Sequence, residues 1–240
     1  MDRKDFSIGD AVSFGWQTLK ENLGFLVLAM LVIWLIQIVF SGPQSAFWMY
    51  GSAGAQVAGA IFSLLSIIVG IFVTIATVKI GLRYCDSQKA DWPDLVEGYT
   101  KFWDVLIGSI LYGLLVLAGL ILLIIPGIYW AIRYHFFPYL IIDRDMRPVE
   151  AIKKSGQMTR GVWWHLFVFW LAAIGIEIIG AILCGIGLLF TTPIVLVAVA
   201  YVYRTLLSET PVAQVTEGPA VPLMAPPETP PSDNPPAATV

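Results

Sequence analysis

Charged residues are scarce in this chain, and their scarcity excludes an ordinary soluble domain. Only 13% of the 240 residues are charged, whereas 58% are hydrophobic, and the mean hydropathy is +0.78. No charged side chain occurs in the 57 residues from Asn22 to Val78, nor in the 28 residues from Val105 to Ile132. One helical crossing of a bilayer needs about 20 residues. The composition therefore predicts a membrane protein whose first apolar run crosses twice.

Cysteine and histidine are rare too, with two residues of each, and their rarity limits the chemistry available to the chain. Cys85 lies beside charged residues and Cys184 between apolar segments, on opposite membrane faces in the topology below, so no disulfide is expected. The sequence holds no metal-binding spacing, phosphate-binding loop, dinucleotide fingerprint or nucleophile elbow. We therefore expect that the protein is not an enzyme and that it needs no cofactor or metal.

The apolar segments predict an all-α fold, a six-helix transmembrane bundle over residues 1–207 built from three hairpins. The expected spans are 23–40, 55–80, 105–125, 128–142, 162–183 and 188–206. Pro126 and Gly127 predict the tight turn before the fourth span, because proline ends a helix and glycine tolerates a reversal. The fourth span covers only about 22 Å of a hydrocarbon core near 30 Å thick. It must therefore extend further, thin the bilayer or lie partly sheltered.

Basic residues predict the orientation of these spans. If the N-terminus is cytoplasmic, thirteen of the fourteen Lys and Arg residues fall on the cytoplasmic side, and Arg133 is the exception. The positive-inside bias predicts this distribution, with both termini in the cytoplasm. The first ten residues mix acids with bases and lead into no cleavage pattern, so we expect them to be retained. Outside the tail the charges nearly balance, which argues against nucleic-acid binding.

The composition changes abruptly at Ser208. Nine of the fifteen prolines lie in residues 208–240, and this segment contains no Lys or Arg. Such a segment cannot bury enough apolar surface to offset the entropy lost on ordering. We expect a disordered cytoplasmic tail, either a solvated spacer or a proline-rich ligand for a protein partner.

Two similar amphipathic stretches precede the first and fifth spans. Aligning Asp10 with Glu150 also pairs Ala11 with Ala151, Val12 with Ile152, Gln17 with Gln157, Lys20 with Arg160 and Leu26 with Leu166. A looser copy precedes the third span, so the chain is either one helix-plus-hairpin unit written three times or a set of similar membrane-entry helices. In the first copy, one helical face holds Ile8, Val12, Gly15, Trp16 and Leu19. We expect such helices to lie in the headgroup plane.

Three ionisable residues fall inside the expected spans: Arg133, His135 and Glu177. Helical rise places Arg133 about 9 Å and Glu177 about 12 Å below the outer turns. Because these depths nearly match, we hypothesise that the two residues form an ion pair. The alternatives are a substrate or headgroup site, or unpaired side chains that face a cavity. For His135 among aromatic neighbours, a packing role is favoured over a proton relay.

A resemblance rests on residues 125–167. This stretch resembles the core signature of a group of bacterial six-helix membrane proteins of unknown function. That group is related to the membrane domain preceding the catalytic barrel in some glycerophosphoryl diester phosphodiesterases. The matching positions are the Pro-Gly turn at 125–128, Arg133, Glu150, Ala151, Ser155, Thr159, Arg160 and Gly161. The resemblance implies a bacterial inner-membrane protein without assigned catalytic residues. The barrel itself is absent, because no soluble stretch is long enough to form one.

These features together favour a non-enzymatic accessory protein of the inner membrane. Its basic and aromatic interfacial helices are suited to anionic lipid headgroups, and those helices or the tail are suited to a protein partner. The alternative is a small-solute or lipid transporter or channel that uses Arg133 and Glu177, because repeats, an interrupted helix and embedded charges also build substrate sites.

Overall fold

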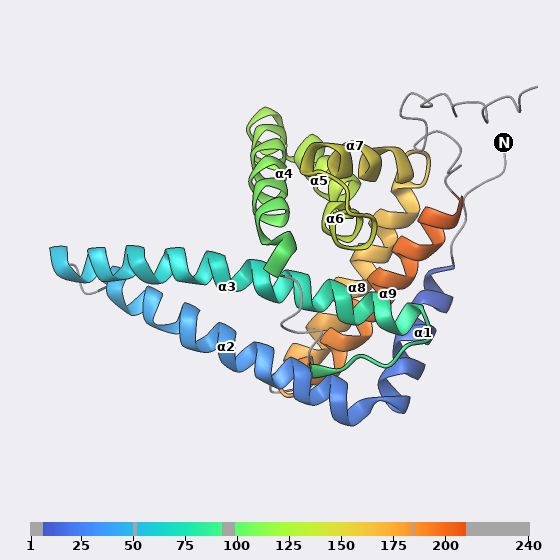
Figure 1. Ribbon diagram of the computed structural model, residues 1–240, viewed down its shortest axis with the longest axis horizontal. Coiled ribbons are helices and arrows are strands. Elements are labelled where there is room, and N and C mark those ends of the chain that lie inside the picture. Colours follow the sequence, from blue (N-terminus) through green and yellow to red (C-terminus); the bar gives the residue numbers. More distant parts are fainter. Residues whose placement is uncertain (1–6, 50–51, 93–98, 184, 210–240) are drawn as a thin grey trace, which may run out of the picture. The chain divides into compact units, whose positions relative to one another are not determined.

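The computed structural model describes residues 7–49, 52–92, 99–183 and 185–209, and within these ranges the chain is helical without strands. The elements are α1 (Ile8–Glu21), α2 (Leu23–Met49), α3 (Ala53–Cys85), the 3-10 turn η2 (Tyr99–Lys101), α4 (Phe102–Leu122), α5 (Ile124–Tyr134), α6 (Phe137–Arg144), α7 (Pro148–Met158), α8 (Trp163–Ile182) and α9 (Leu188–Glu209) (Figure 1). The expected disordered tail, beyond the last residues of α9, lies outside the described residues.

Five of the described helices are long and apolar enough to cross a membrane. The qualifying stretches are Leu23–Phe40, Gly54–Cys85, Phe102–Leu122, Trp163–Ile182 and Leu188–Ser208. They correspond to the first, second, third, fifth and sixth expected spans. Many large apolar side chains on these helices are exposed, including Leu64 at 64% and Leu171 at 60%. Such surfaces suit a lipid environment, because water would oppose their exposure.

The fourth expected span, 128–142, is not one continuous helix, so six spans are not confirmed. Its residues are divided between α5 and α6, with the break at His135 and Phe136. Pro138 lies in the first turn of α6. Within a continuous helix its ring would clash with the carbonyl of Tyr134 and remove a hydrogen bond. At 1.5 Å per residue, α5 and α6 are about 16 Å and 12 Å long, too short to cross separately.

The reversal between α4 and α5 occurs earlier than the sequence indicated. Leu123 is the extended residue between the helices, with φ −169° and ψ 152°, and Pro126 and Gly127 lie in α5 itself. Proline is tolerated near a helix start, where backbone N–H groups have no partner within the helix. A Cβ at Gly127 would lie 2.9 Å from the backbone nitrogen of Leu120. Gly127 therefore permits close packing of α4 and α5 and does not form the turn.

Helix α9 is the most enclosed of the five long helices. Half of its apolar stretch is buried, compared with 17–22% in the other four. Helices α1 and α3 both pack against it. A Cβ at Gly15 of α1 would lie 3.2 Å from the carbonyl carbon of Ile194, and a Cβ at Gly81 of α3 would lie 2.9 Å from the Cβ of Ala200. Glycines therefore allow both helices to approach α9 closely.

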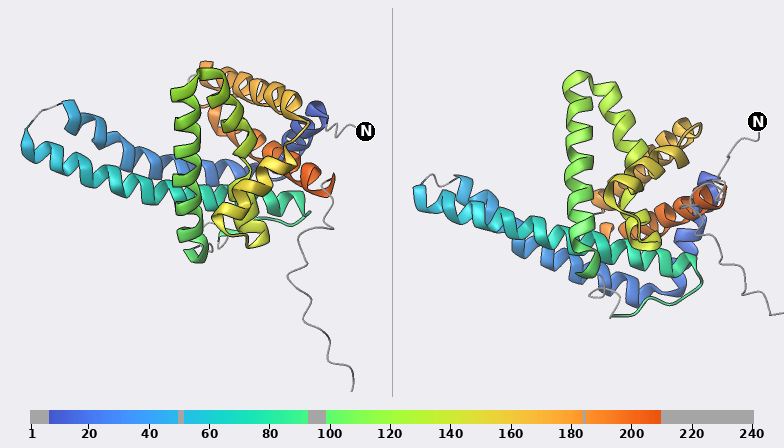
Figure 2. Two further views of the ribbon diagram at one scale, coloured as in Figure 1. Left: turned by 90° about the horizontal axis from the view of Figure 1, so that it is seen from above. Right: turned by 45° about the horizontal axis from the view of Figure 1, so that its top comes forward.

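Two helical hairpins extend from this packed region. Helices α2 and α3 lie side by side as a long hairpin, and Ser66 donates a hydrogen bond to the carbonyl of Phe40 at 2.8 Å. Helices α4 and α5 form a second hairpin that leaves α3 in a different direction (Figure 2). The long apolar faces are consequently distributed over separate hairpins rather than collected in one bundle of parallel helices.

Helix α1 buries most of the apolar face that the sequence indicated, with Trp16 as the exception. Its buried residues are Ala11, Gly15, Thr18 and Leu19, whereas Trp16 is 49% exposed. The buried face lies against α9, so this helix is held by protein contacts. The sequence pattern assigned Trp16 to the same apolar face, because apolar character alone does not distinguish a protein contact from a lipid contact.

The burial pattern agrees with the alignment of the first and third copies. The alignment pairs each residue of the first copy with the residue 140 positions later. Six such pairs are buried in both copies: Ala11 with Ala151, Gly15 with Ser155, Leu19 with Thr159, Leu26 with Leu166, Ala29 with Phe169 and Ile33 with Ala173. The packing partners differ, because α1 contacts α9 whereas α7 contacts α4, α5 and α6. The two copies thus bury equivalent positions, although they bury them against different helices. Residues 93–98 of the looser copy lie outside the described residues.

Candidate functional site

The candidate site is the junction where α7 packs across the end of α5. Arg133 lies in the last turn of α5. Its Nε donates to the carbonyl of Gly156 at 3.2 Å, and its Nη1 donates to the hydroxyl of Tyr129 at 2.9 Å. Its Cζ lies 5.5 Å and 5.7 Å from the ring centroids of Tyr129 and Tyr134. Among the residues that the structure describes, no carboxylate contacts Arg133.

Helix α7 and the residue that follows it also provide hydrogen-bond donors for a backbone carbonyl at the end of α5. The carbonyl of Arg133 accepts hydrogen bonds from Ser155 Oγ at 3.1 Å and from Thr159 Oγ1 at 3.0 Å. Ser155 and Thr159 are 0% and 1% exposed. The last carbonyls of a helix lack partners within that helix and are costly to bury unpaired. The two hydroxyls therefore explain how α5 can end inside the protein.

Gly156 allows this contact to form. A Cβ at Gly156 would lie 2.7 Å from Cε1 of Tyr134 and 3.5 Å from Nε of Arg133. A larger residue would push the Tyr134 ring and separate α7 from α5. Arg133, Gly156, Ser155 and Thr159 consequently form one junction, and three of them are positions that carried the family resemblance.

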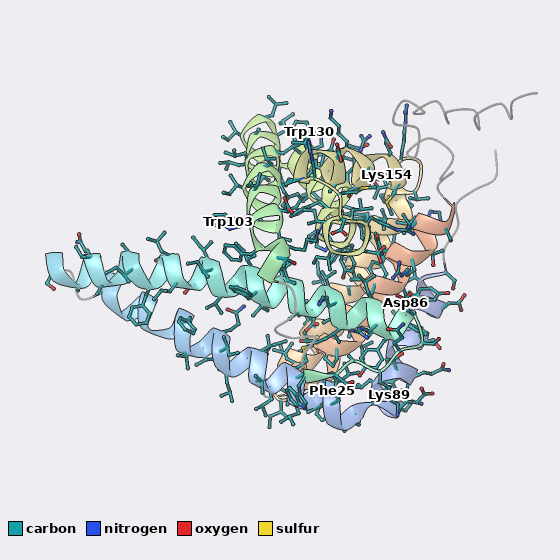
Figure 3. The ribbon with its side chains drawn as sticks, viewed as in Figure 1. Phe25, Asp86, Lys89, Trp103, Trp130 and Lys154 are labelled. Atoms are coloured by element: carbon teal, nitrogen blue, oxygen red, sulfur yellow. The ribbon has the colours of Figure 1, made fainter. Side chains whose placement is uncertain are left out.

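A groove of about 460 Å³ opens beside this junction. Helix α4 contributes Leu111 and Leu115, and α5 contributes Arg133 and Tyr134. Helix α7 contributes the rest of the lining: Val149, Ile152, Lys153, Gly156 and Gln157. The groove thus combines apolar walls with two cationic side chains and holds no acidic residue. Figure 3 labels Lys154, the neighbour of Lys153 on α7, which is not among the lining residues.

Glu177 lies elsewhere, at the contact between α8 and α9. Its Oε2 accepts hydrogen bonds from Thr191 Oγ1 and Thr192 Oγ1, each at 3.3 Å. The structure therefore gives Arg133 and Glu177 separate partners in place of the hypothesised ion pair. The ion pair was predicted because Arg133 and Glu177 lie at similar depths below the turns. Depth does not say toward which neighbouring helix each side chain points. Arg133 points toward α7, whereas Glu177 points toward α9.

His135 lies at the break between α5 and α6 and makes aromatic contacts. Its ring centroid is 4.4 Å from that of Trp170, at an interplanar angle of 74°, and 5.9 Å from that of Phe136. These edge-on contacts suit a packing role. The same histidine lines a cavity of about 430 Å³ with Tyr112 and Trp170.

Sequence reasoning missed an ionic cluster that joins the ends of three helices. Arg204 on α9 donates from Nη1 to Asp143 Oδ2 at 2.9 Å and from Nη2 to Asp86 Oδ2 at 2.6 Å. The hydroxyl of Tyr203 donates to Asp143 Oδ2 at 2.9 Å. Asp86 follows α3, where Figure 3 labels it, and Asp143 lies on α6. The available signal was that each of these charges lies at or just beyond the end of the second segment of an expected hairpin.

These helices and the junction at Arg133 define the class of protein. Within the described ranges it is all-helical, with five helices apolar enough to span a membrane and a polar junction beside an interrupted helix. The chain belongs to the DUF975 family, described as proteins of unknown function, whose family model matches residues 59–210. The matched range includes Arg133, Ser155 and Thr159, and also the cluster around Arg204.

Curated relatives are similar along most of the chain. Uncharacterized proteins of Mycobacterium bovis and of two strains of Mycobacterium tuberculosis are each 24% identical to it over 238 residues. The alignment covers 90% of this chain and 73% of each relative. No solved structure matches the chain. The family and these relatives assign no activity, so function has to be inferred from the geometry.

Proposed function

We propose that this protein is a non-enzymatic protein of the bacterial inner membrane that holds an anionic lipid headgroup in the groove between α4, α5 and α7. One observation carries the proposal. Arg133 and Lys153 bring two positive charges to a groove whose described lining contains no carboxylate. Arg133 is partly buried, and an uncompensated cation in apolar surroundings is costly, so a bound anion would remove that cost, while the exposed Lys153 adds attraction at the edge of the groove.

The chemistry of Arg133 supports a phosphate as the anion. Gly156 and Tyr129 occupy Nε and one Nη1 donor, and the other guanidinium donors have no partner among the described residues. Guanidinium donors match phosphate oxygens with directed hydrogen bonds, and a nearby ammonium adds charge. Leu111 and Leu115 supply the apolar wall that an acyl chain would follow. A diacyl phospholipid with a net negative headgroup satisfies both requirements.

Several finer features belong to the same proposal. Both termini face the cytoplasm, which is consistent with the distribution of Lys and Arg. Residues 125–167 support a relationship to the membrane domain of glycerophosphoryl diester phosphodiesterases, without transfer of hydrolase activity. The protein engages lipids through the groove, and it engages a protein partner through the interfacial helices or residues 208–240. The transport alternative relied on a joint site of Arg133 and Glu177, and their separate partners do not favour it.

Lipid binding tests the proposal directly. Purified protein in a mild detergent should bind phosphatidylglycerol more tightly than phosphatidylcholine of the same chains, measured by native mass spectrometry titration. Lys153→Gln and Arg133→Gln should each weaken phosphatidylglycerol binding about tenfold, the equivalent of one lost charge-assisted hydrogen bond.

Lys154→Gln is the matched control, because it removes the neighbouring positive charge on α7 without altering the groove lining. It should change the affinity by less than about twofold, because Lys154 does not line the groove and acts on the lipid only as a more distant, screened charge. Equal losses in the Lys153 and Lys154 variants would contradict the groove as the binding site. Lys153 makes no contact that holds the junction, so this comparison remains informative if Arg133→Gln unfolds.

Cysteine accessibility tests the orientation. In a background with Cys85 and Cys184 replaced by serine, Ile186→Cys should react with a membrane-impermeant maleimide added to intact cells. Ile186 is 69% exposed in the α8–α9 connection, which the proposal places at the periplasmic face. Lys153→Cys should react only after permeabilisation. Labelling of position 153 in intact cells would overturn the orientation.

A further inference from the structure

A second cavity, of about 340 Å³, lies between α8 and α9 and contains Glu177. Its walls are otherwise apolar and include Ala173, Ile178 and Ala181 of α8 and Leu188 of α9. The indole of Trp170 also lines it. Glu177 is the sole ionisable residue of this lining, and it belongs to a helix apolar enough to span a membrane.

The local packing holds the Glu177 carboxyl group in place through two neighbouring hydroxyls. Thr191 and Thr192 both donate to the same oxygen, Oε2. No cationic side chain contacts Glu177 among the described residues. A Cβ at Gly180 would meet the side chain of Thr191, so that glycine permits the approach of α9 that brings Thr191 to Glu177.

This cavity shares two lining residues with the one that contains His135. Trp170 and Ile174 line both cavities. Beyond them lie Phe167, Leu171 and Tyr112, so an apolar wall extends along α8 from the carboxylate toward α4. A ligand with one charged end and an alkyl chain could therefore place its charge at Glu177 and its chain along α8.

We infer that the Glu177 cavity binds a lipophilic organic cation, specifically a long-chain alkylammonium ion. The carboxylate supplies the opposite charge. The second carboxylate oxygen, Oε1, has no partner among the described residues and accepts a hydrogen bond from the ammonium. The apolar lining takes the chain. This site is separate from the anionic-headgroup groove, and neither proposal depends on the other.

The test uses three ligands that share one chain: dodecylamine, dodecanol and dodecanoate. Each competes with tritiated tetraphenylphosphonium, a lipophilic cation, for protein in dodecyl maltoside, measured by scintillation proximity. Tetraphenylphosphonium should bind saturably, and dodecylamine should displace it at concentrations at least about tenfold lower than dodecanol. Dodecanoate should be the weakest competitor. Displacement by dodecanol at the same concentration as dodecylamine would overturn the inference, because it would show an apolar cavity without charge selection.

Three variants locate the site. Glu177→Gln should weaken tetraphenylphosphonium binding about tenfold, as expected for the loss of one charge attraction in a desolvated cavity. Glu150→Gln, the same change on the exposed surface of α7, should leave it unaltered. Ala181→Phe keeps the carboxylate and fills the cavity, so it should also reduce binding. If Glu177→Gln does not fold, the binding measured for Ala181→Phe serves as the test. Undiminished tetraphenylphosphonium binding by either folded variant would overturn the inference.

Discussion

Replacing Arg204 with leucine is expected to destabilise the protein by about 3–5 kcal/mol, the cost of leaving a buried charge without its partner. The side chain of Asp143 is only 13% exposed, and the guanidinium of Arg204 is the cation that neutralises it from α9. The substitution leaves this carboxylate with the hydroxyl of Tyr203 and a longer contact from Arg144. Asp86 adds less, because it is 45% exposed and its attraction is screened.

Thermal unfolding in detergent measures this effect. A chain of this size loses about 2–4 °C of Tm per kcal/mol, so Arg204→Leu should lower Tm by about 10 °C. Arg144→Leu is the matched control. Arg144 also contacts Asp143 Oδ2, at 3.2 Å, but its side chain is 50% exposed. Its loss should lower Tm by less than about 3 °C.

A double-mutant cycle separates the coupling energy of the Arg204–Asp143 ion pair from other effects of each substitution on stability. Asp143→Asn removes the charge that Arg204→Leu leaves unpaired, so the double variant should be more stable than the sum of the single effects by about 1–3 kcal/mol. Additive effects would show that the contact among α3, α6 and α9 does not depend on this pairing.

The combined substitution of Ser155→Ala and Thr159→Val is expected to cost about 1–3 kcal/mol, because it removes both hydroxyl donors from the carbonyl of Arg133. The two side chains are almost completely buried, so water cannot readily replace them. Valine preserves the shape of threonine, which limits any added cavity. The expected result is a lower Tm and, because Arg133 is displaced with the end of α5, weaker binding of phosphatidylglycerol.

Thr205→Val supplies a matched control for this junction. Among the described residues, the hydroxyl of Thr205 donates to the carbonyl of Tyr201 alone, four residues earlier in its own helix, at 3.0 Å. Such a bond is local, and its loss should change Tm by less than about 3 °C. If Thr205→Val lowered Tm as much as the double substitution, the hydroxyls on α7 would have no special part in ending α5.

Much of the helix inventory could be predicted from the sequence. The expected first span, 23–40, is contained in α2, although that helix continues to Met49, and α8 begins and ends within one residue of the expected span 162–183. These features depend on hydropathy within one segment, which is local information. The fourth span failed because residues 128–142 are mostly apolar and therefore score as a crossing, while Pro138 interrupts the backbone. Hydropathy does not measure that interruption.

The candidate site could be predicted only in part. Arg133 was identified as significant because an arginine in an apolar run is rare, and Ser155 and Thr159 were matched through the family signature. Its partners were not predicted. The hypothesis joined Arg133 to Glu177 because opposite charges attract, but Arg133 uses a backbone carbonyl and a tyrosine hydroxyl. A backbone carbonyl occurs at every residue, so no sequence pattern marks the one at Gly156.

The sequence by itself determined that this protein is helical and apolar enough for a membrane, because helix formation and lipid solubility depend on runs of neighbouring side chains. The tertiary structure alone decided which charges meet. Arg204 joins Asp86 and Asp143 across 118 and 61 residues of chain, and Arg133 and Glu177 face different helices. Ion-pair choice depends on the direction of each side chain around its helix and on how closely helices approach, and those quantities are set by packing.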